Sequence, residues 1–243
     1  MNLLAIETAT ETCSVALSIN GELRERYQHA PRQHAELLLP WVQSLLAEAE
    51  IGIGSLDVIA FSRGPGSFTS LRMGIGVVQG LAWAAGVPVV PVSSLAATAQ
   101  SAISQIAPSA SVRRALVALD ARMNEVFAGI FELNDDGIMT AAGEEMVCAP
   151  GEILTLADAD TWGIGIGFER YPVLAGLREQ LAGVKTGVWP RASSVLELAQ
   201  WWMQTNKPLT AELAQPVYLR NDVAKKSVSQ HPANKDPANK DNE

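Results

Sequence analysis

Residues 3–28 read LLAIETATETCSVALSINGELRERYQ, and this stretch decides the fold. Leu3 to Glu7 is a short apolar run, Ser14 to Ile19 alternates between apolar and polar residues, and Glu22 to Gln28 follows closely. Asn20-Gly21, between the last two runs, is a strong signal for a two-residue hairpin turn. The pattern predicts three consecutive strands at the start of the chain.

Helices and strands alternate after this opening. The spacing of apolar residues predicts helices over Gln33 to Glu50, Phe68 to Ala85 and Ser94 to Ile106. Short apolar runs between them predict strands over Asp57 to Ser62 and Pro88 to Val92. Three strands followed by this alternation predict an α/β protein with a mixed sheet covered by helices on both faces.

The second half of the chain repeats the order of the first. Ala115 to Asp120 echoes Leu3 to Glu7, and each of these two strands ends on a carboxylate. Val126 to Glu132 follows as a strand, and Asn134 to Gly137 is typical of a turn. The later elements are predicted as strand Ile138 to Val147, helix Gly151 to Ala157, strand Thr161 to Ile166, helix Val173 to Leu181, strand Val184 to Val188 and helix Ser193 to Thr205.

An internal duplication explains this order, and it divides the chain into two lobes over 1–108 and 109–225. The 243 residues contain 48% hydrophobic residues, which is enough to give each lobe a core. Residues 229–243 contain Pro-Ala-Asn-Lys-Asp twice and almost no large apolar residue. We expect 226–243 to be a disordered tail.

Charge and composition exclude several classes of protein. The formal net charge is −8 and the pI is about 5.0, so the average surface repels phosphate backbones, and a nucleic-acid partner would need another protein to hold it. Cys13 and Cys148 are too few for a disulfide framework, which fits a reducing compartment. We see no export signal, and Gln79 and Pro88 interrupt the longest apolar stretch. The sequence predicts a soluble cytoplasmic protein without a membrane contact.

The sharpest local motif is Arg63-Gly64-Pro65-Gly66-Ser67-Phe68-Thr69, between a predicted strand and a predicted helix. Such a turn can direct backbone N–H groups and a helix dipole at an anion. It is not a Walker loop, because no Lys-Ser or Lys-Thr pair follows the glycines. The structural alternative is a tight turn in which Ser67 or Thr69 caps the helix.

Polar residues also end the first strand of each half. Glu7-Thr8-Ala9-Thr10 lies where a two-lobed kinase would place a metal-facing carboxylate and phosphate-binding hydroxyls, and Asp120 supplies a second carboxylate. The alternative is a polar strand end that faces a water-filled cleft. A residual nucleotide or anion site would comprise Glu7, Thr8, Thr10, Gly64, Gly66, Ser67, Thr69 and Asp120. Because no partner base or metal ligand accompanies them, we predict no catalytic residue.

Metal and nucleophile signals are weak. The three histidines, His29, His34 and His231, lack metal-ligand spacing, so we predict no metal site. His34 opens a helix and is expected to pack or cap there. Cys13 has no nearby base and reads as an inert core thiol. Gly163-Ile164-Gly165-Ile166-Gly167 lacks dinucleotide spacing and reads as a close-packed turn.

Two helices carry more apolar surface than one face needs. In the first, Leu38 and Leu45 can point inward while Leu37 and Trp41 remain outside. The helix after the glycine turn carries Gly76, Gly80 and Ala84 at four-residue spacing, a smooth stripe that a second helix could approach closely. The alternative is that both helices are buried inside the monomer. The predicted partner interface comprises His34, Leu37, Leu38, Trp41, Leu45, Met73, Gly76, Val77, Gly80, Trp83 and Ala84.

Several of these segments together resemble the TsaB (YeaZ) family. They are Leu4 to Leu17, Gln33 to Pro40, Arg63 to Arg72 and, in the thinner second half, Gln215 to Arg220. The resemblance implies an actin-like or Hsp70-like (ribonuclease H-like) duplicated fold. It also implies a role beside TsaD and TsaE in forming threonylcarbamoyladenosine at the position following the anticodon, in tRNAs that read codons beginning with A.

The same resemblance implies that this chain is the non-catalytic partner. TsaD carries a His-x-x-x-His metal motif just after the strand that corresponds to Val89 to Val92, whereas Ser94 and Thr98 fall at about those positions here. The family pattern implies a heterodimer with TsaD through the two helices, recruitment of TsaE, a homodimer through the same helices, and only indirect contact with tRNA. No cofactor is expected, although weak nucleotide binding stays open. The competing reading is an actin-like ATPase or small-molecule kinase, and for a peptidase we find no nucleophile.

Overall fold

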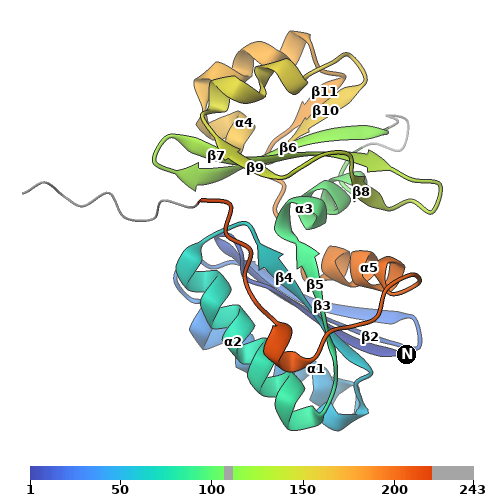
Figure 1. The fold of residues 1–243 in the computed structure, drawn as a ribbon. Helices are drawn as coiled ribbons and strands as arrows, with labels where there is room; N and C mark the ends of the chain where they lie inside the picture. The colour runs from blue at the N-terminus through green and yellow to red at the C-terminus, as the bar shows by residue number, and fades with distance from the viewer. Residues whose placement is uncertain (107–111, 221–243) are drawn as a thin grey trace, which may run out of the picture.

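The computed structural model describes residues 1–106 and 112–220. They form two lobes, each built on a mixed β-sheet, and helix α3 (Ser94–Ile103) lies between the two sheets (Figure 1). The predicted lobe boundary at 108/109 and the predicted tail over 226–243 lie outside the described residues.

The first sheet has the strand order β3-β2-β1-β4-β5. β1 pairs antiparallel with β2 and parallel with β4, so the sheet is mixed as predicted. The hairpin turn is also confirmed, since Asn20 and Gly21 both have positive φ, 51° and 89°. The strands are β1 (Asn2–Glu7), β2 (Thr12–Ile19), β3 (Glu22–His29), β4 (Val58–Gly64) and β5 (Val89–Ser93).

Helices cover both faces of this sheet. Leu4 and Ile6 of β1 pack under α1 (His34–Glu48) and α2 (Phe68–Ala85), which form the outer layer. Leu3 and Ala5 point the opposite way, into a core shared with α3 and α5 (Ala192–Trp202). β1 is therefore buried on both faces, which explains its continuous apolar run. The short 3-10 helices η1 (Ile53–Ser55) and η4 (Ala211–Leu213) complete this lobe, and η4 packs on α2.

The second sheet repeats the first, with the strand order β8-β7-β6-β10-β11 and β9 also paired to β7. β6 pairs antiparallel with β7 and parallel with β10, as β1 does with β2 and β4. The matching order and directions confirm the duplicated fold. The strands are β6 (Arg114–Arg122), β7 (Glu125–Leu133), β8 (Met139–Ala141), β9 (Met146–Cys148), β10 (Thr161–Ile164) and β11 (Gly183–Lys185).

Two helices cross between the halves. α3 follows the first sheet in sequence, yet its Leu95, Ala99 and Ala102 pack into the core of the second sheet. α5 follows the second sheet, yet its Ala192 and Val195 pack on the first. Each sheet is therefore covered in part by a helix from the other half of the chain.

The outer layer of the second lobe differs from the prediction. Predicted helices over Gly151 to Ala157 and Val173 to Leu181 are the 3-10 helices η2 (Pro150–Leu156) and η3 (Pro172–Glu179), each with proline near its start. The predicted strand Ile138 to Val147 is divided into β8 and β9. A short helix α4 (Gly167–Arg170) follows β10 and was not predicted.

Local signals fix the ends of α2. The Ser67 hydroxyl caps its first turn by accepting from the Ser70 N–H, and Gly86 ends it in the left-handed region at φ 68°. Among the residues that the structure describes, no helix is both long and apolar enough to cross a membrane.

Candidate functional site

The outer layer of the first lobe presents an exposed stripe along α2. Trp83 is 76% exposed, and a Cβ added at Gly76 or Gly80 would meet no atom within 4 Å. Met73 and Val77 flank the stripe and are half-buried, and Ala84 is exposed. On the neighbouring helix α1, Leu37 and Trp41 are half-buried. We call Leu37, Trp41, Met73, Gly76, Val77, Gly80, Trp83 and Ala84 the α1–α2 surface.

Three members of the predicted interface lie in the core instead. Leu38 and Leu45 are 1% and 0% exposed and pack against the first sheet, and His34 is 4% exposed. The His34 Nε2 lies 3.0 Å from the Thr12 carbonyl oxygen, so this histidine packs and holds the start of α1, as the packing alternative stated. These residues support the α1–α2 surface from beneath and do not contribute to it.

A cleft of about 1020 Å³ opens between the lobes. The turn between β1 and β2, the start of α2 and the end of β6 line it, together with residues of the last described segment, 217–220. Its charged lining consists of four arginines and two carboxylates, Arg32, Arg122, Arg170, Arg220, Glu11 and Asp120. The cleft is therefore less acidic than the chain as a whole.

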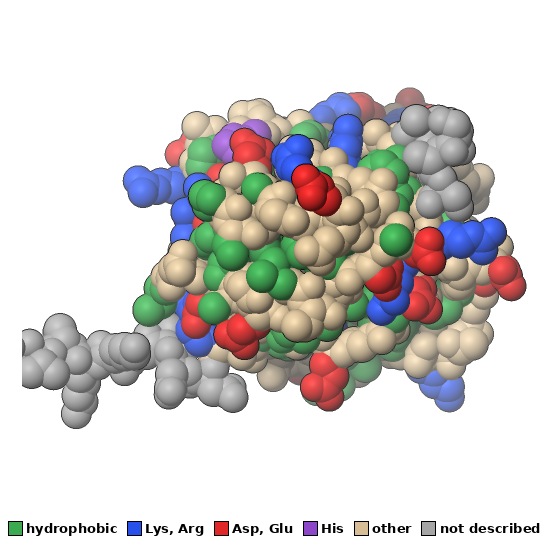
Figure 2. All heavy atoms as spheres, turned by 90° about the horizontal axis from the view of Figure 1, so that it is seen from above, with side chains coloured by type: hydrophobic (Ala, Val, Ile, Leu, Met, Phe, Trp, Pro, Cys, Tyr) green, Lys and Arg blue, Asp and Glu red, His purple; other side chains and the backbone are tan. Residues whose placement is uncertain are grey.

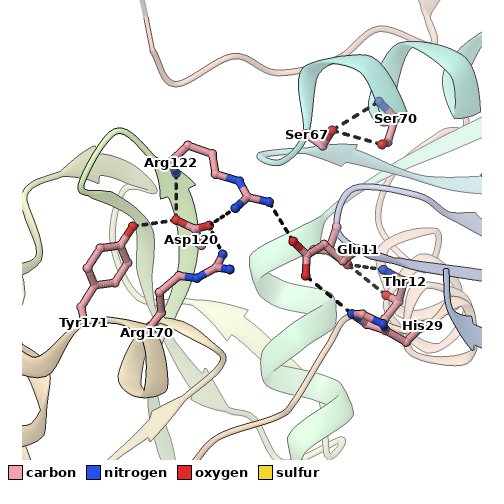
Figure 3. Close-up of polar contacts among 10 residues, drawn as sticks. Glu11, Thr12, His29, Ser67, Ser70, Asp120, Arg122, Arg170 and Tyr171 are labelled. Carbon is pink, nitrogen blue, oxygen red and sulfur yellow. Dashed lines mark hydrogen bonds and ion pairs between the residues drawn. The ribbon is translucent and has the colours of Figure 1, made fainter. Parts of the chain in front are cut away.

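A chain of ion pairs lines this cleft, and one of them, Arg122 with Glu11, joins the two lobes (Figure 3). The Arg122 Nη2 donates to the Glu11 Oε1 at 2.7 Å, and its Nη1 lies 3.2 Å from the Asp120 Oδ2. Arg170 also pairs with Asp120. On the first lobe, the His29 Nε2 lies 3.5 Å from the other Glu11 oxygen. Three of the four cleft arginines, Arg122, Arg170 and Arg220, are thus already paired with carboxylates of the chain.

Asp120 is ionised and fully engaged. Although its partial burial acts to raise its pKa, hydrogen bonds from the Tyr171 hydroxyl (2.6 Å) and the Arg122 N–H (2.9 Å), with the two guanidinium charges, hold the pKa below its usual value. Burial and the hydrogen bond to Asp120 raise the pKa of Tyr171 to about 12. Neither group is free to transfer a proton near neutral pH.

Glu7 does not face the cleft. It lies on the α3 and α5 side of β1, with Leu3 and Ala5, and is fully buried. Asp120 lies on the opposite side of its own strand, where Leu116 and Ala118 pack towards α4 and η3. The two carboxylates therefore project from opposite faces of equivalent strands, and of these two members of the predicted anion site only Asp120 lines the cleft.

Thr8 and Gly64 also lie outside the cleft lining. The Thr8 Oγ1 donates to the Ser70 carbonyl at 3.1 Å, and Thr8 is 3% exposed. Gly64 is buried with φ 99°, and a Cβ there would lie 3.0 Å from Leu71 and 3.1 Å from the Val217 carbonyl oxygen. Of the predicted anion site, the cleft brings together Thr10, Gly66, Ser67, Thr69 and Asp120.

The glycine turn packs tightly against the first strand. A Cβ at Gly66 would lie 2.2 Å from the Ala9 carbonyl oxygen, and that oxygen accepts the Ser67 N–H at 2.7 Å. One of the backbone donors at the start of α2 is therefore already used within the chain. Ser67 caps the helix as the alternative stated, whereas Thr69 is exposed.

The other sequence predictions concern isolated residues. Burial, with a smaller effect of Glu7, raises the pKa of the Cys13 thiol to about 12, which keeps it protonated and unreactive. Gly165 has φ 107°, and a Cβ at Gly167 would lie 2.8 Å from the Ala118 carbonyl oxygen, so the predicted close-packed turn is confirmed. Among the described residues, no three His, Cys, Asp or Glu side chains gather as a metal site would require.

Most of the charged residues of the cleft were not predicted from the sequence. Glu11, Arg122 and Arg170 come together only when the two lobes fold, so no local motif marks them. Arg220 lies in the segment already noted for its family resemblance, and it pairs with Glu125. The turn that places Arg122 has three consecutive positive φ angles, at Arg122, Met123 and Asn124, and no sequence pattern marks it.

The duplicated sheets and the interlobe cleft define a protein of the actin-like (ribonuclease H-like) class. The family model described as TsaD, tRNA N6-adenosine threonylcarbamoyltransferase, matches residues 27–173, which is more than half of the chain. The chain belongs to the TsaB (YeaZ) family, which is related to TsaD.

Relatives that match over nearly their whole length support this family assignment. The tRNA threonylcarbamoyladenosine biosynthesis protein TsaB of Escherichia coli K12 is 36% identical over 233 residues, covering 94% of this chain and 98% of that protein. The TsaB of Haemophilus influenzae is 35% identical over 238 residues, covering 94% and 97%. The solved structure of YeaZ from Pseudomonas aeruginosa superposes with a TM-score of 0.81 at 40% identity, covering 90% of this chain and 99% of that one.

Proposed function

We propose that this chain acts in tRNA threonylcarbamoyladenosine biosynthesis as the non-catalytic partner of TsaD, and that it binds TsaD through the α1–α2 surface. The names of its whole-length relatives support the pathway. The observation that supports binding through this surface is the exposed stripe of Gly76, Gly80, Trp83 and Ala84 on α2. A large exposed tryptophan beside glycines suits close packing of a partner helix.

The chemistry of the cleft supports an accessory role. Asp120 is held by two arginines, Glu7 is buried away from the cleft, and the Cys13 thiol stays protonated. An ATPase or kinase would need free carboxylates that face a common phosphate, and the described residues offer none. We propose that the reacting groups are supplied by TsaD.

Any nucleotide affinity of the cleft is expected to be weak. A phosphate would have to displace Glu11 or Asp120 from Arg122, because both already bind its guanidinium group. Calorimetry of the isolated chain with ATP and magnesium tests this expectation. Tight binding of ATP, with turnover of the nucleotide, would support the alternative that the chain is an ATPase or kinase.

We further propose that tRNA contacts fall mainly on TsaD and that TsaE joins the composite surface. Seen from above, the second lobe carries lysine and arginine side chains interspersed with acidic ones around its rim (Figure 2). Mixed charge of this kind and a net charge of −8 give little counterion release on binding RNA. In the absence of TsaD, we expect a homodimer through the same α1–α2 surface.

Matched glutamate variants test the interface. Val77 lies on the α1–α2 surface, whereas Val173 is 49% exposed on η3 of the second lobe. We expect Val77→Glu and Trp83→Glu to weaken TsaD binding at least tenfold, about 1.4 kcal/mol, because an interface would bury the new charge. Val173→Glu should bind as the parent chain does.

Reconstitution of the modification from purified components gives the second measurement. Omitting this chain, or supplying Trp83→Glu, should lower the yield of threonylcarbamoyladenosine, and Val173→Glu should restore it. Full binding and full modification with both interface variants would refute the proposed surface. Loss with all three variants would place the partner elsewhere.

A further inference from the structure

Three buried polar atoms without a hydrogen-bond partner among the described residues belong to one end of the first sheet. They are the Glu7 Oε2, the Ser62 Oγ and the Ser94 Oγ, and each residue is at most 3% exposed. Apart from the Arg114 Nε, the described residues contain no other such side-chain atom. Buried polar atoms are normally paired, so three in one region call for a shared partner.

Strand pairing places two of them side by side. β1 and β4 are parallel, with Ala5 opposite Ala60 and Ile6 opposite Phe61, so Glu7 follows in register with Ser62. Ala5 and Ala60 both face the core under α3 and α5. Because side chains alternate along a strand, Glu7 and Ser62 face the same side, towards α3.

Ser94 is the third residue of this group. It is the first residue of α3 and directly follows β5, whose Val92 is the register partner of Ser62. α3 also packs on β4. The Ser94 carbonyl oxygen accepts from the Thr98 Oγ1 at 2.7 Å, so the backbone of this turn is satisfied while the Ser94 hydroxyl is not.

The chemistry of the three groups selects a neutral ligand. The Glu7 Oε1 already accepts the Ala9 N–H at 2.5 Å, and burial raises the pKa of Glu7 to about 8, so near pH 7 its Oε2 carries a proton. The nearby Cys13 thiol is also neutral, since its pKa is raised to about 12. A carboxylic acid and two hydroxyls suit a ligand that both accepts and donates, whereas a hard cation prefers ionised carboxylates and more oxygen ligands.

We propose that one internal water molecule binds here, hydrogen-bonded to the Glu7 Oε2 and to the hydroxyl groups of Ser62 and Ser94. Three hydrogen bonds to otherwise unpaired groups are typical of a buried water. The water connects β1, β4 and α3, the helix that lies between the two sheets. It is a fixed part of the joint between the lobes and is independent of the α1–α2 surface.

A crystal structure of the full chain at atomic resolution tests the proposal directly. We expect one isolated density peak within hydrogen-bond distance of all three oxygen atoms. The same crystals soaked in rubidium chloride should show no anomalous peak there. Direct contacts among the three side chains without a peak, or a rubidium signal at this position, would overturn the proposal.

Infrared spectroscopy tests it in solution. The parent chain should show the carbonyl band of a protonated carboxylic acid at pH 7, and Glu7→Gln should lack it. Ser62→Ala removes one partner of the water and should shift the band. Ser101→Ala is the matched control, because the Ser101 Oγ is buried but already lies 2.9 Å from the Ser194 Oγ. Absence of the band in the parent chain, or equal shifts in both serine variants, would contradict the proposal.

Discussion

The two lobes share one strand order but carry different outer layers. Over the first sheet lie two long helices, α1 and α2, whose outward face includes a tryptophan that is 76% exposed. Over the second lie the short helices η2, α4 and η3, which turn Ile153, Phe168 and Leu174 inward. Both lobes leave some apolar residues exposed, such as Val173 on η3, but only the first lobe presents them along two long neighbouring helices.

Core truncations under each outer layer should have the largest effects. Leu45 and Leu174 are both fully buried, one on the inner face of α1 and one in η3. Replacing either with alanine should lower the free energy of unfolding by about 2–5 kcal/mol, measured by urea denaturation. Leu45→Ala should also weaken TsaD binding, and Leu174→Ala should not while the chain stays folded. If Leu45→Ala and Leu174→Ala weakened TsaD binding equally, the outer layers of the two lobes would contribute to that binding in the same way.

Two glycines of α2 should respond in opposite ways to alanine. A Cβ at Gly74 would lie 2.1 Å from the Thr8 Oγ1, so Gly74→Ala should destabilise the chain by about 1–3 kcal/mol. Gly76→Ala adds a methyl group where no atom lies within 4 Å, and helix propensity should stabilise the isolated chain by about 0.5–1 kcal/mol. Thermal unfolding checks both values.

The same Gly76→Ala variant sharpens the comparison of the two layers. If a partner helix packs closely on α2, the added methyl group should weaken TsaD binding even though the isolated chain becomes more stable. Binding that is unchanged, in a chain that is more stable, would remove Gly76 from the interface.

The buried Glu7 should make stability depend on pH. Its pKa is raised from 4.5 to about 8 in the folded chain, so the folded state binds the proton more tightly than the unfolded state. This contribution is fully present below pH 4.5 and is lost as pH rises through about 8, by up to about 1.4 kcal/mol per pH unit and by about 2 kcal/mol between pH 6 and 8. Urea denaturation of Glu7→Gln should lack this loss. If the free energy of unfolding changed with pH in the same way for the parent chain and Glu7→Gln, the raised pKa of Glu7 would be contradicted.

Ion pairs across the cleft should have the smallest effect. The Arg122 side chain is 64% exposed and that of Glu11 is 33% exposed, so solvent screens their interaction. Glu11→Gln should change the free energy of unfolding by less than about 1 kcal/mol, and the difference should shrink at high salt. A larger loss that resists salt would show that this pair fixes the lobes relative to each other.

Most of the secondary structure of the first lobe could be predicted from the sequence. The strand runs, the Asn20-Gly21 turn and the capping residue Ser67 are local signals, and each lies where it was predicted. In the second lobe, Pro150 and Pro172 start helices that tighten into 3-10 geometry, which apolar spacing alone does not distinguish from an α-helix.

The candidate sites were less predictable, because side-chain direction decides them. Glu7 and Asp120 each end a first strand, but a single step along a strand reverses the face that a side chain occupies. Helical spacing did predict that Leu38 and Leu45 point inward and Leu37 outward, so the error was to include the two inward residues in the interface. The partners of Arg122 and Arg170 come from distant parts of the chain, so no spacing rule could bring them together.

The crossing of α3 and α5 has a consequence for how the chain acquires its structure. The first sheet can form early during synthesis, but α3 covers only part of one face, and the rest stays uncovered until the α5 residues through Trp202 have left the ribosome. Neither half could be cut out as a stable fragment, since each would leave behind the helix that shields it. Folding of this protein should therefore finish as one cooperative event near the end of translation.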